Sequence, residues 1–557
     1  MSPERPVSIE HVDALATHCE CALAAGERLL AALSEALRRE SESGADAQQA
    51  AQSALHGLAW TATLLRALRE MLGWAQGLAR EGRLGRLEAL LLQSAFGEYL
   101  SQIEGGVPMS QGEIFRVQSV CPEALATFRA EASVRGLSER GFDRSTRAEI
   151  AQWLVDGRET RSFGDPGFED PMLTEIRAQL ARWSDDHAAA AHALHLDNAL
   201  IPESTIAELA HLGVFGLTVP ARWGGSGLGK TALCVVTEEL SRGWIGYGSL
   251  GTRTEIAAEL ILGSGTPAQQ ARWLPGLCKG SIIPAAAFTE PDTGSDLAAL
   301  RTRAEPGQDA AGQPIWRITG NKTWTTHGAR SDLLTLLART EPGVAGYRGL
   351  SMLLLPKPRG DDQNPFPAPG LSGSEIEVLG YRGMKEYEIG FEDYAVPADA
   401  ILGETRGAGF KQLMRTFESA RIQTAARAVG VAQNALELAL NYACSRHQFG
   451  QAIVAFPRVA DKLAWMAVEI MVARKRSFHA AREKDAGRRC DLEAGMAKLL
   501  AARVAWAAAD NAVQIHGGNG YALEYRISRV LVDARILSVF EGAAEIQAQI
   551  IARALID

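Results

Sequence analysis

The spacing of apolar residues predicts helices over most of the chain. Residues 1 to about 160 are rich in Ala, Leu, Glu and Arg, with apolar residues at helical spacing and almost no strand signal. The helical pattern resumes over residues 172–280 and again after Gly407, where apolar residues between Val459 and Ile470 follow the 4-3-4 spacing of one buried stripe. Together these stretches predict a mainly α protein.

One stretch carries the pattern of strands instead. From residue 281 to about 402, β-branched and aromatic runs alternate with Gly and Pro, as in residues 315–319 and 350–355. A Gly, Pro and Asp cluster at residues 163–171 predicts a linker after the first helical region. The expected order is an extra helical domain at 1–160, a helical domain at 172–280, a β-domain at 281–402 and a helical domain at 405–557.

Length and composition agree with several globular domains. At about 150 residues per domain, 557 residues predict three or four folding units. The chain is 46% hydrophobic and 22% charged, which excludes a disordered or collagen-like chain. Its 66 acidic residues outnumber the 57 basic ones, so nucleic acid is not an expected partner.

The cysteines and the N-terminal sequence bear on location. Seven cysteines without a C-x-x-C pair predict neither a disulfide framework nor a metal site, and they fit a reducing cytoplasm. No run approaches the ~20 apolar residues of a membrane span, and the first residues lack the layout of a signal peptide. We therefore expect a cytoplasmic protein with no membrane partner.

Residues 224–231, GGSGLGKT, match the phosphate-loop pattern G-x-x-x-x-G-K-T in full. That motif works when a buried strand leads directly into the loop, whose backbone N–H groups then hold the phosphates. Here residues 220–223 intervene, and the acidic strand candidate at 530–533 comes far later in the chain. A mobile Gly-rich surface loop is the better explanation, and an NTPase that uses Lys230 and Thr231 is the alternative.

Four further segments carry side chains that suit a cofactor. Residues 288–296, FTEPDTGSD, follow an apolar run and could bind a flat polar ring and a phosphate, or form only a tight turn. Residues 324–327, WTTH, offer an aromatic face and hydroxyls on a strand, although a core tryptophan would look the same. Residues 446–450 (RHQFG) and 514–520 (QIHGGNG) end two helices, where Arg and Gly also occur as helix caps.

A fifth segment, SVFEGAAEI at residues 538–546, starts the last predicted helix, and Ser538 and Glu541 have the spacing of a capping box. In chain order, T-E-P-x-x-G-S-D, W-x-T, R-x-x-F-G, Q-x-x-G-G-x-G and E-G resemble the motifs of the FAD-dependent acyl-CoA dehydrogenase family. The resemblance covers residues 172–557. It implies an α+β, mainly α fold with a helical domain, a central β-domain and a C-terminal four-helix bundle, extended here by the helical N-terminal domain.

The resemblance implies FAD as the cofactor. In the family these motifs contact the isoalloxazine ring and the pyrophosphate and, across a subunit interface, the rest of FAD. The matching residues here are Phe288, Thr289, Trp324 and Thr326 at the ring, Ser295 at the pyrophosphate, Arg446 and Phe449 from a second subunit, Gln514, Gly517 and Gly518 near the adenosine, and Glu545. Two departures, Pro457 where the family often has Gln and Ala543 where it often has Thr, each remove a possible FAD contact.

The resemblance also implies the reaction. The carboxylate of Glu541 would remove the α-proton of an acyl-CoA while the β-hydrogen leaves as hydride, and the backbone N–H of Glu541 would stabilise the thioester oxygen. Some family members carry the base at the position of Ala420 instead. Glu418 lies about 200° around a helix from Ala420, so it is a poor substitute.

Arg253 indicates which acyl group is oxidised. In the family its helix lines the acyl pocket, and no carboxylate stands three or four positions from Arg253. A guanidinium facing that pocket would pair with the distal carboxylate of a dicarboxylyl-CoA; the rival interpretation is a surface arginine or one paired with a distant acid. The spellings ESARIQTAAR at residues 418–427 and GMKEY at 383–387, with the N-terminal addition, resemble those family members that act on (2S)-methylsuccinyl-CoA. The reaction that this resemblance implies is (2S)-methylsuccinyl-CoA to mesaconyl-CoA. The other implied substrate contacts are Arg421, Tyr247, Ser295 and Gly542.

Glutaryl-like or monocarboxylic short-chain acyl-CoA substrates are alternatives within the class, and a non-catalytic protein of the same fold is another. The resemblance implies electron-transfer flavoprotein as the acceptor. An oxidase is the less favoured alternative, because acyl-CoA oxidases usually extend at the C-terminal side, whereas this chain has its extra domain at the N-terminal side. Family members without the N-terminal addition commonly form tetramers through helix packing between dimers. We expect residues 1–160 to cover one such surface and to leave a homodimer.

Overall fold

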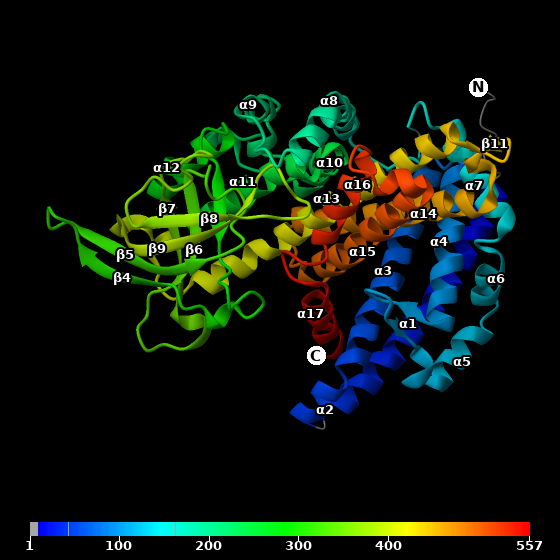
Figure 1. Ribbon diagram of the computed structural model, residues 1–557. Helices are drawn as coiled ribbons and strands as arrows, with labels where there is room; N and C mark the ends of the chain where they lie inside the picture. The colour runs from blue at the N-terminus through cyan, green and yellow to red at the C-terminus, as the bar shows by residue number, and fades with distance from the viewer. Residues whose placement is uncertain (1–8, 43, 162) are drawn as a thin grey trace. The chain divides into compact units, whose positions relative to one another are not determined.

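The computed structural model describes residues 9–42, 44–161 and 163–557. The chain forms two compact units, Met1–Ala178 with Thr424–Asp557 and Gln179–Gln423. The boundaries between them fall within two long helices, α8 (Pro171–Leu196) and α13 (Gly409–Ser445), both labelled in Figure 1. Over the described ranges, no helix is both long and apolar enough to cross a membrane.

Helices make up most of the described N-terminal part of the first unit, coloured blue to cyan in Figure 1. They are α1 (Ile9–Ser41), α2 (Ala45–Ala50), α3 (Gln52–Arg80), α4 (Arg86–Gly105), α5 (Pro122–Ala130), α6 (Ala132–Arg140) and α7 (Arg144–Asp156). A short antiparallel pair, β1 (Val107–Pro108) and β2 (Ile114–Phe115), interrupts them. Each of these strands has two residues, which is too short for the apolar alternation that would predict it.

The same unit closes with a second set of helices, on which the first set packs. This set comprises the end of α13, α14 (Pro457–Asp485), α15 (Asp491–His516), α16 (Arg526–Ile536) and α17 (Ala544–Ile556), with a hairpin of β10 (His447–Gln448) and β11 (Gln451–Ala452) after α13. Helix α3 contacts α14, α15 and α17, and α4 and α7 contact α14. The Arg503 guanidinium lies 4.6 Å from the ring of buried Trp60 and pairs with buried Glu469 at 3.1 Å. The N-terminal helices therefore cover a surface of the C-terminal ones.

The second unit combines helices with a seven-stranded sheet, the green and yellow-green part of Figure 1. Its helices include α9 (Glu203–His211), α10 (Lys230–Gly243), α11 (Ile245–Ser264) and α12 (Pro267–Cys278). Its strands are β3 (Pro284–Ala287), β4 (Arg303–Gln308), β5 (Pro314–Lys322), β6 (Leu333–Arg339), β7 (Leu350–Pro356), β8 (Leu371–Ile376) and β9 (Glu386–Pro397). The order is β3-β6-β4-β5-β9-β8 with β7 beside β6; β6 pairs in parallel with β3 and β4, and the other pairs are antiparallel.

Packing on both faces of this sheet explains why β6 and β7 are mainly apolar. On one face, side chains of β6 and β7 join side chains of the other strands in an apolar cluster that includes Ile318 and Phe391. On the other face, Leu337 and Leu354 join a cluster with Ile261 of α11 and helix α12. A strand buried on both faces shows a continuous apolar run. The strands predicted at 315–319 and 350–355 are confirmed as parts of β5 and β7.

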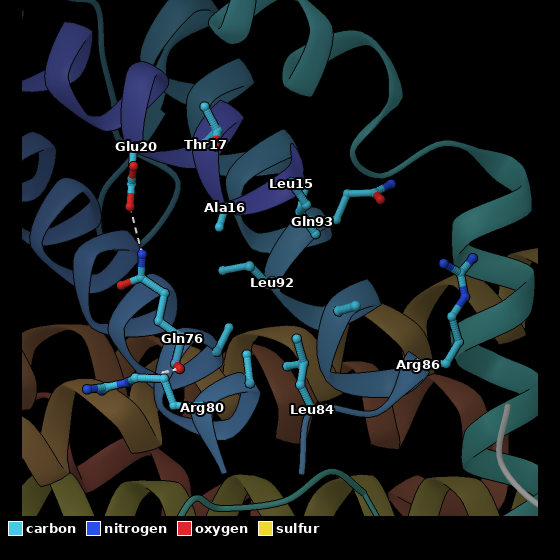
Figure 2. Close-up of a pocket in the computed structure, with 13 residues that line it drawn as sticks. Leu15, Ala16, Thr17, Glu20, Gln76, Arg80, Leu84, Arg86, Leu92 and Gln93 are labelled. Atoms are coloured by element: carbon cyan, nitrogen blue, oxygen red, sulfur yellow. Dashed lines mark hydrogen bonds between the residues drawn. The ribbon is translucent and has the colours of Figure 1, made fainter. Parts of the chain in front are cut away.

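A cavity of about 760 Å³ opens among α1, α3 and α4 of the first unit (Figure 2). Apolar side chains such as Leu15 and Leu92 line it, and a hydrogen bond of 2.7 Å joins Gln76 to Glu20 at its edge. Its lining residues include none of those that the family resemblance implies. The cavity is therefore separate from the predicted active-site residues.

Candidate active site

The carboxylate of Glu541 is held by two side chains of α13. Thr424 donates to Oε2 through its hydroxyl at 2.6 Å, and Arg427 donates to Oε1 through Nη2 at 2.8 Å. Arg427 is fully buried, and its guanidinium lies 4.8 Å from the ring of Phe540. A neighbouring guanidinium stabilises the ionised form of a carboxylate, which is the form that accepts a proton.

The capping-box interpretation of Glu541 is wrong. Helix α17 begins only at Ala544, and its N-cap residue Ala543 has no side chain that could bind a backbone N–H. The Glu541 carboxylate points instead to α13, because Glu541 has a left-handed backbone with φ of +53°. Such a conformation costs a non-glycine residue roughly 1–3 kcal/mol and is typical of functional sites.

The turn that carries Glu541 is fixed from behind. The carbonyl of Gly542, which has φ of +90°, accepts from Lys498 Nζ at 2.5 Å and from Gln547 Nε2 at 3.3 Å. A Cβ at this glycine would lie 2.1 Å from Gln547 Nε2. The sequence therefore needs glycine after Glu541 to keep the carboxylate in place.

In the second unit, the T-E-P turn follows directly after β3. The Glu290 carboxylate accepts the backbone N–H groups of Arg301 and Thr302 at 2.8 Å each, and Lys322 Nζ at 2.9 Å. Lys322 also donates to the carbonyl of Phe288 at 3.0 Å. Glu290 is thus the internal anchor of the turn. It leaves Phe288 and Thr289 half-buried and Ser295 exposed.

The W-x-T segment lies after β5 and not on a strand, which corrects the prediction. Trp324 has φ of +56°, and its side chain is 54% exposed. Thr326 donates its hydroxyl to Glu386 Oε1 at 2.7 Å, and the buried Thr325 hydroxyl has no hydrogen-bond partner among the described residues. A large aromatic face is therefore left open to a ligand.

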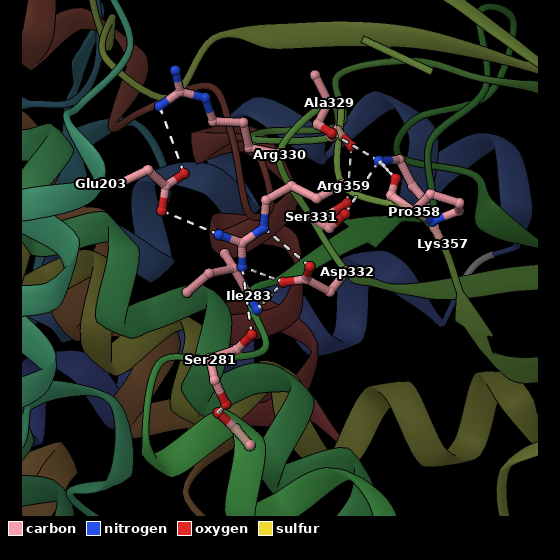
Figure 3. Close-up of polar contacts among 12 residues, drawn as sticks. Glu203, Ser281, Ile283, Ala329, Arg330, Ser331, Asp332, Lys357, Pro358 and Arg359 are labelled. Carbon is pink, nitrogen blue, oxygen red and sulfur yellow. Dashed lines mark hydrogen bonds and ion pairs between the residues drawn. The ribbon is translucent and has the colours of Figure 1, made fainter. Parts of the chain in front are cut away.

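A polar cluster fixes the chain just beyond this segment (Figure 3). Arg359 pairs with Asp332 at 2.6 Å, and Asp332 accepts the backbone N–H of Ile283 at 2.8 Å. Lys357 donates to the carbonyls of Ala329 and Ser331 at 2.7 and 3.1 Å, and burial lowers the pKa of Lys357 to about 8. The cluster ties the W-x-T loop to the start of β3.

The implied cofactor contacts of the first unit are open to solvent. Phe449, in the β10–β11 hairpin, is 94% exposed with φ of +51°. An added Cβ at Gly517 or Gly518 would meet no atom within 4 Å, so the backbone there can approach a ligand closely. Arg446, Gln514 and Glu545 are exposed as well.

These residues fit FAD. In both units exposed aromatic side chains stand beside open glycine or hydroxyl positions, and a flat ring joined to a pyrophosphate needs that combination. Trp324 and Phe449 also share a left-handed backbone with Glu541. The second unit holds Tyr247, Arg253, Phe288, Thr289, Ser295, Trp324, Thr326 and Arg421, and the first holds the other implied residues.

Arg253 lies on α11 and is not a surface arginine. It is half-buried, and its Nη2 donates to the hydroxyl of Tyr381 at 3.1 Å. Its charge also acts on the buried carboxyl of Glu386. Burial raises the pKa of Glu386 to about 7, and the hydrogen bond from Thr326 and the Arg253 charge only partly offset this effect.

The secondary substrate candidates are more deeply packed. Tyr247 is 1% exposed and lies edge-on to Trp244 and Trp183, with ring centroids 5.3 and 5.1 Å apart. Arg421 is buried with its guanidinium 5.9 Å from the ring of Phe417. Tyr247 therefore has the surroundings of a core residue.

Sequence reasoning missed Thr424, Arg427, Tyr381 and Glu386. Thr424 and Arg427 follow Ala420 by four and seven positions, a helical spacing that could have revealed a common face. Glu386 is one of several acidic residues of β9. Nothing in the sequence shows that Glu386 is the buried one on which the charge of Arg253 acts.

The glycine-rich loop does not have the structure of a phosphate loop. Two 3₁₀ turns, η2 (Val214–Gly216) and η3 (Ala221–Trp223), precede it in place of a strand. The backbone N–H groups of residues 226, 227 and 228 donate to carbonyls of this same segment at 2.7–2.9 Å. Lys230 pairs with Glu255 and Glu259 of α11. The loop is thus held by internal bonds, and its lysine anchors the helix that carries Arg253.

Replacement of Lys230 with methionine is expected to lower the free energy of unfolding by about 3 kcal/mol, because it removes the cation that pairs with the buried Glu255 carboxylate and leaves it the hydroxyl of Thr218 as a donor. Chemical denaturation measures the change. The matched control is Lys279→Met, since Lys279 is an exposed lysine of the same unit. Equal stability of the two variants would contradict the anchoring role.

Comparison with known proteins places three domain descriptions of one family along the chain. Acyl-CoA dehydrogenase, N-terminal domain, matches residues 171–281; the middle domain matches 285–394; and the C-terminal domain matches 407–556. The three matches follow one another along the chain between residues 171 and 556.

Individual relatives extend this result. The (2S)-methylsuccinyl-CoA dehydrogenase of Cereibacter sphaeroides is 57% identical over 532 residues, which cover 95% of each chain. A solved glutaryl-CoA dehydrogenase in complex with glutaryl-CoA is 30% identical with a TM-score of 0.64, covering 70% of this chain and 97% of that one. A structure described for the electron transferring flavoprotein of Acidaminococcus fermentans is also 30% identical with a TM-score of 0.64, covering 69% and 97%. The first relative thus aligns with nearly the whole chain, whereas the two solved structures align with 69–70% of it.

Proposed function

This chain belongs to the acyl-CoA dehydrogenase family, and from that premise we propose that it oxidises (2S)-methylsuccinyl-CoA to mesaconyl-CoA. The observation that carries the proposal is the 57% identity to a methylsuccinyl-CoA dehydrogenase over 95% of both chains. The half-buried Arg253 on α11 supports a substrate with a distal carboxylate. A fatty-acyl pocket would gain nothing from a guanidinium.

Members of this family are FAD-dependent flavoproteins, and bound FAD supplies the acceptor for the β-hydride. The chain's own contribution begins with Glu541, whose carboxylate accepts the α-proton and ends as a carboxylic acid. Thr424 and Arg427 orient the carboxylate before the reaction. The backbone N–H of Glu541 stabilises the thioester oxygen as negative charge develops there. Phe288, Thr289, Trp324 and Thr326 hold the ring, as their motifs imply.

Substrate selection rests on Arg253. Its planar guanidinium offers two parallel N–H donors to one carboxylate, so the distal end of the substrate is both attracted and oriented. Orienting that end also restricts the positions that the rest of the acyl group can take. The buried Tyr381 hydroxyl, which accepts from Nη2, keeps the guanidinium in position.

A comparison of substrates tests this proposal. Purified enzyme should oxidise methylsuccinyl-CoA with a kcat/KM at least about 100-fold above that for butyryl-CoA, because only the former uses the charge-assisted pair with Arg253. Succinyl-CoA and glutaryl-CoA complete the series. A preference for butyryl-CoA or glutaryl-CoA would contradict the proposed substrate.

Electron-transfer flavoprotein is the proposed electron acceptor, and the cytoplasm is the proposed location. Support for the acceptor comes from the family and from the relative described with the electron transferring flavoprotein of Acidaminococcus fermentans. Support for the location comes from the cysteine usage of the sequence.

We also propose a homodimer. The N-terminal helices cover α14, α15 and α17, a surface that would otherwise be open to further helix packing. Light scattering should give twice the chain mass of 59.7 kDa. A particle of four times that mass would contradict the proposed role of the N-terminal helices.

A further inference from the structure

The carboxyl group of Glu386 is buried with one oxygen unused. Glu386 is the first residue of β9, and its Oε1 accepts the hydroxyl of Thr326 at 2.7 Å. Its Oε2 is also buried and has no hydrogen-bond partner among the residues that the structure describes. A buried carboxylate oxygen without a hydrogen bond is energetically costly, so a hydrogen-bonding group from a ligand is expected beside Oε2.

Arg253 of α11 is the charged group that acts on this carboxyl. Lys385, the residue before Glu386, pairs with Glu375 at 2.8 Å. The residue opposite Glu386 on β8 is Ile376, which carries no charge. Burial lowers the pKa of His327 to about 3, so that ring is neutral. The Arg253 charge therefore favours the ionised form of Glu386, which burial and the hydrogen bond from Thr326 otherwise control.

We propose that Glu386 takes up a proton when an acyl-CoA with a distal carboxylate binds at Arg253, and that the new Oε2–H donates to that carboxylate. This inference rests on the proposed function, which puts a substrate carboxylate at Arg253. Two carboxylates beside one guanidinium cannot both stay ionised at low cost, so the buried one is protonated. The proton comes from solvent and returns to it on product release, and no electron moves.

The uptake makes binding depend on pH in a defined direction. Burial raises the pKa of Glu386 to about 7 in the free protein, and a bound carboxylate raises it further. Below pH 7 the carboxyl is already protonated, so affinity is flat. Above pH 7 each binding event requires a proton, and affinity falls by up to about tenfold per pH unit.

Titration calorimetry of the FAD-loaded enzyme measures the proton directly. Binding of mesaconyl-CoA at pH 8 is followed in buffers of different ionisation enthalpy, and tiglyl-CoA, in which a methyl replaces the carboxylate, is the matched ligand. We expect uptake of close to one proton with mesaconyl-CoA, about none with tiglyl-CoA, and about none with either ligand at pH 6.

Variants assign the proton to one residue. Glu386→Gln should bind mesaconyl-CoA without proton uptake and with a flat pH profile, because the amide donates without titrating. Glu388→Gln, an exposed carboxylate on the same strand, should behave as the wild type. Equal proton uptake with the two ligands in the wild type would overturn the inference even if Glu386→Gln did not fold, as would uptake that persists in Glu386→Gln. Failure of the wild type to bind mesaconyl-CoA would overturn the proposed function, and this inference with it.

Discussion

Replacement of Glu541 with glutamine is expected to lower kcat for methylsuccinyl-CoA by about 10³–10⁴-fold while FAD remains bound. The amide is the same size as the carboxylate and can still meet Thr424 and Arg427, but it cannot accept the α-proton. No second carboxylate replaces it on α13, since Ala420 stands at the alternative base position. Single-turnover flavin absorbance measures the rate, and the visible spectrum of the purified variant measures the bound FAD.

Glu418→Gln is the matched control for this prediction. Glu418 is a buried glutamate of α13 and the one acidic residue close in sequence to Ala420 that could be argued to be the base. Its replacement should leave kcat within about tenfold, because its side chain leaves the helix about 200° away from Ala420. A Glu541→Gln variant with near-normal turnover would contradict the assignment of Glu541 as the base.

Replacement of Arg253 with alanine should remove the preference for a dicarboxylyl substrate. We expect kcat/KM for methylsuccinyl-CoA to fall by about 10³-fold, because a desolvated charge pair is lost and the substrate carboxylate is left unpaired. Turnover of 2-methylbutyryl-CoA, which has no distal carboxylate, should change by less than about tenfold. The ratio of the two kcat/KM values is the measurement.

Arg253→Lys supplies a graded comparison. Lysine keeps the charge but loses the planar pair of donors, so it should restore only part of the preference. If Arg253→Ala and the wild type had the same ratio, Arg253 would have no role in selection. The distal carboxylate would then need another partner, and the buried Arg421 would be the first candidate.

The sequence predicted the parts of this protein that depend on local pattern. The T-E-P, W-x-T and E-G motifs are short and can be recognised from their own residues, and the T-E-P turn is held partly by contacts near it in the chain, as Glu290 is by the N–H groups of residues 301 and 302. The helical and β regions follow the apolar spacing. These features can be predicted without knowledge of the tertiary structure.

The parts that depend on distant packing could not be predicted in the same way. The capping-box spacing of Glu541 was misleading because Thr424 and Arg427, far away in the sequence, bind its carboxylate. Lys230 completes a phosphate-loop pattern, yet its partners are two glutamates of α11. The fold brings such charged residues together, and their pairing cannot be deduced from their spacing in the sequence.

Anaerobic reduction of the bound flavin tests most directly whether this protein is a flavin-dependent methylsuccinyl-CoA dehydrogenase. Methylsuccinyl-CoA should rapidly and fully bleach the flavin of the purified protein, and butyryl-CoA and succinyl-CoA should act much more slowly. A protein without flavin, or a flavin bleached by butyryl-CoA but not by methylsuccinyl-CoA, would contradict this assignment.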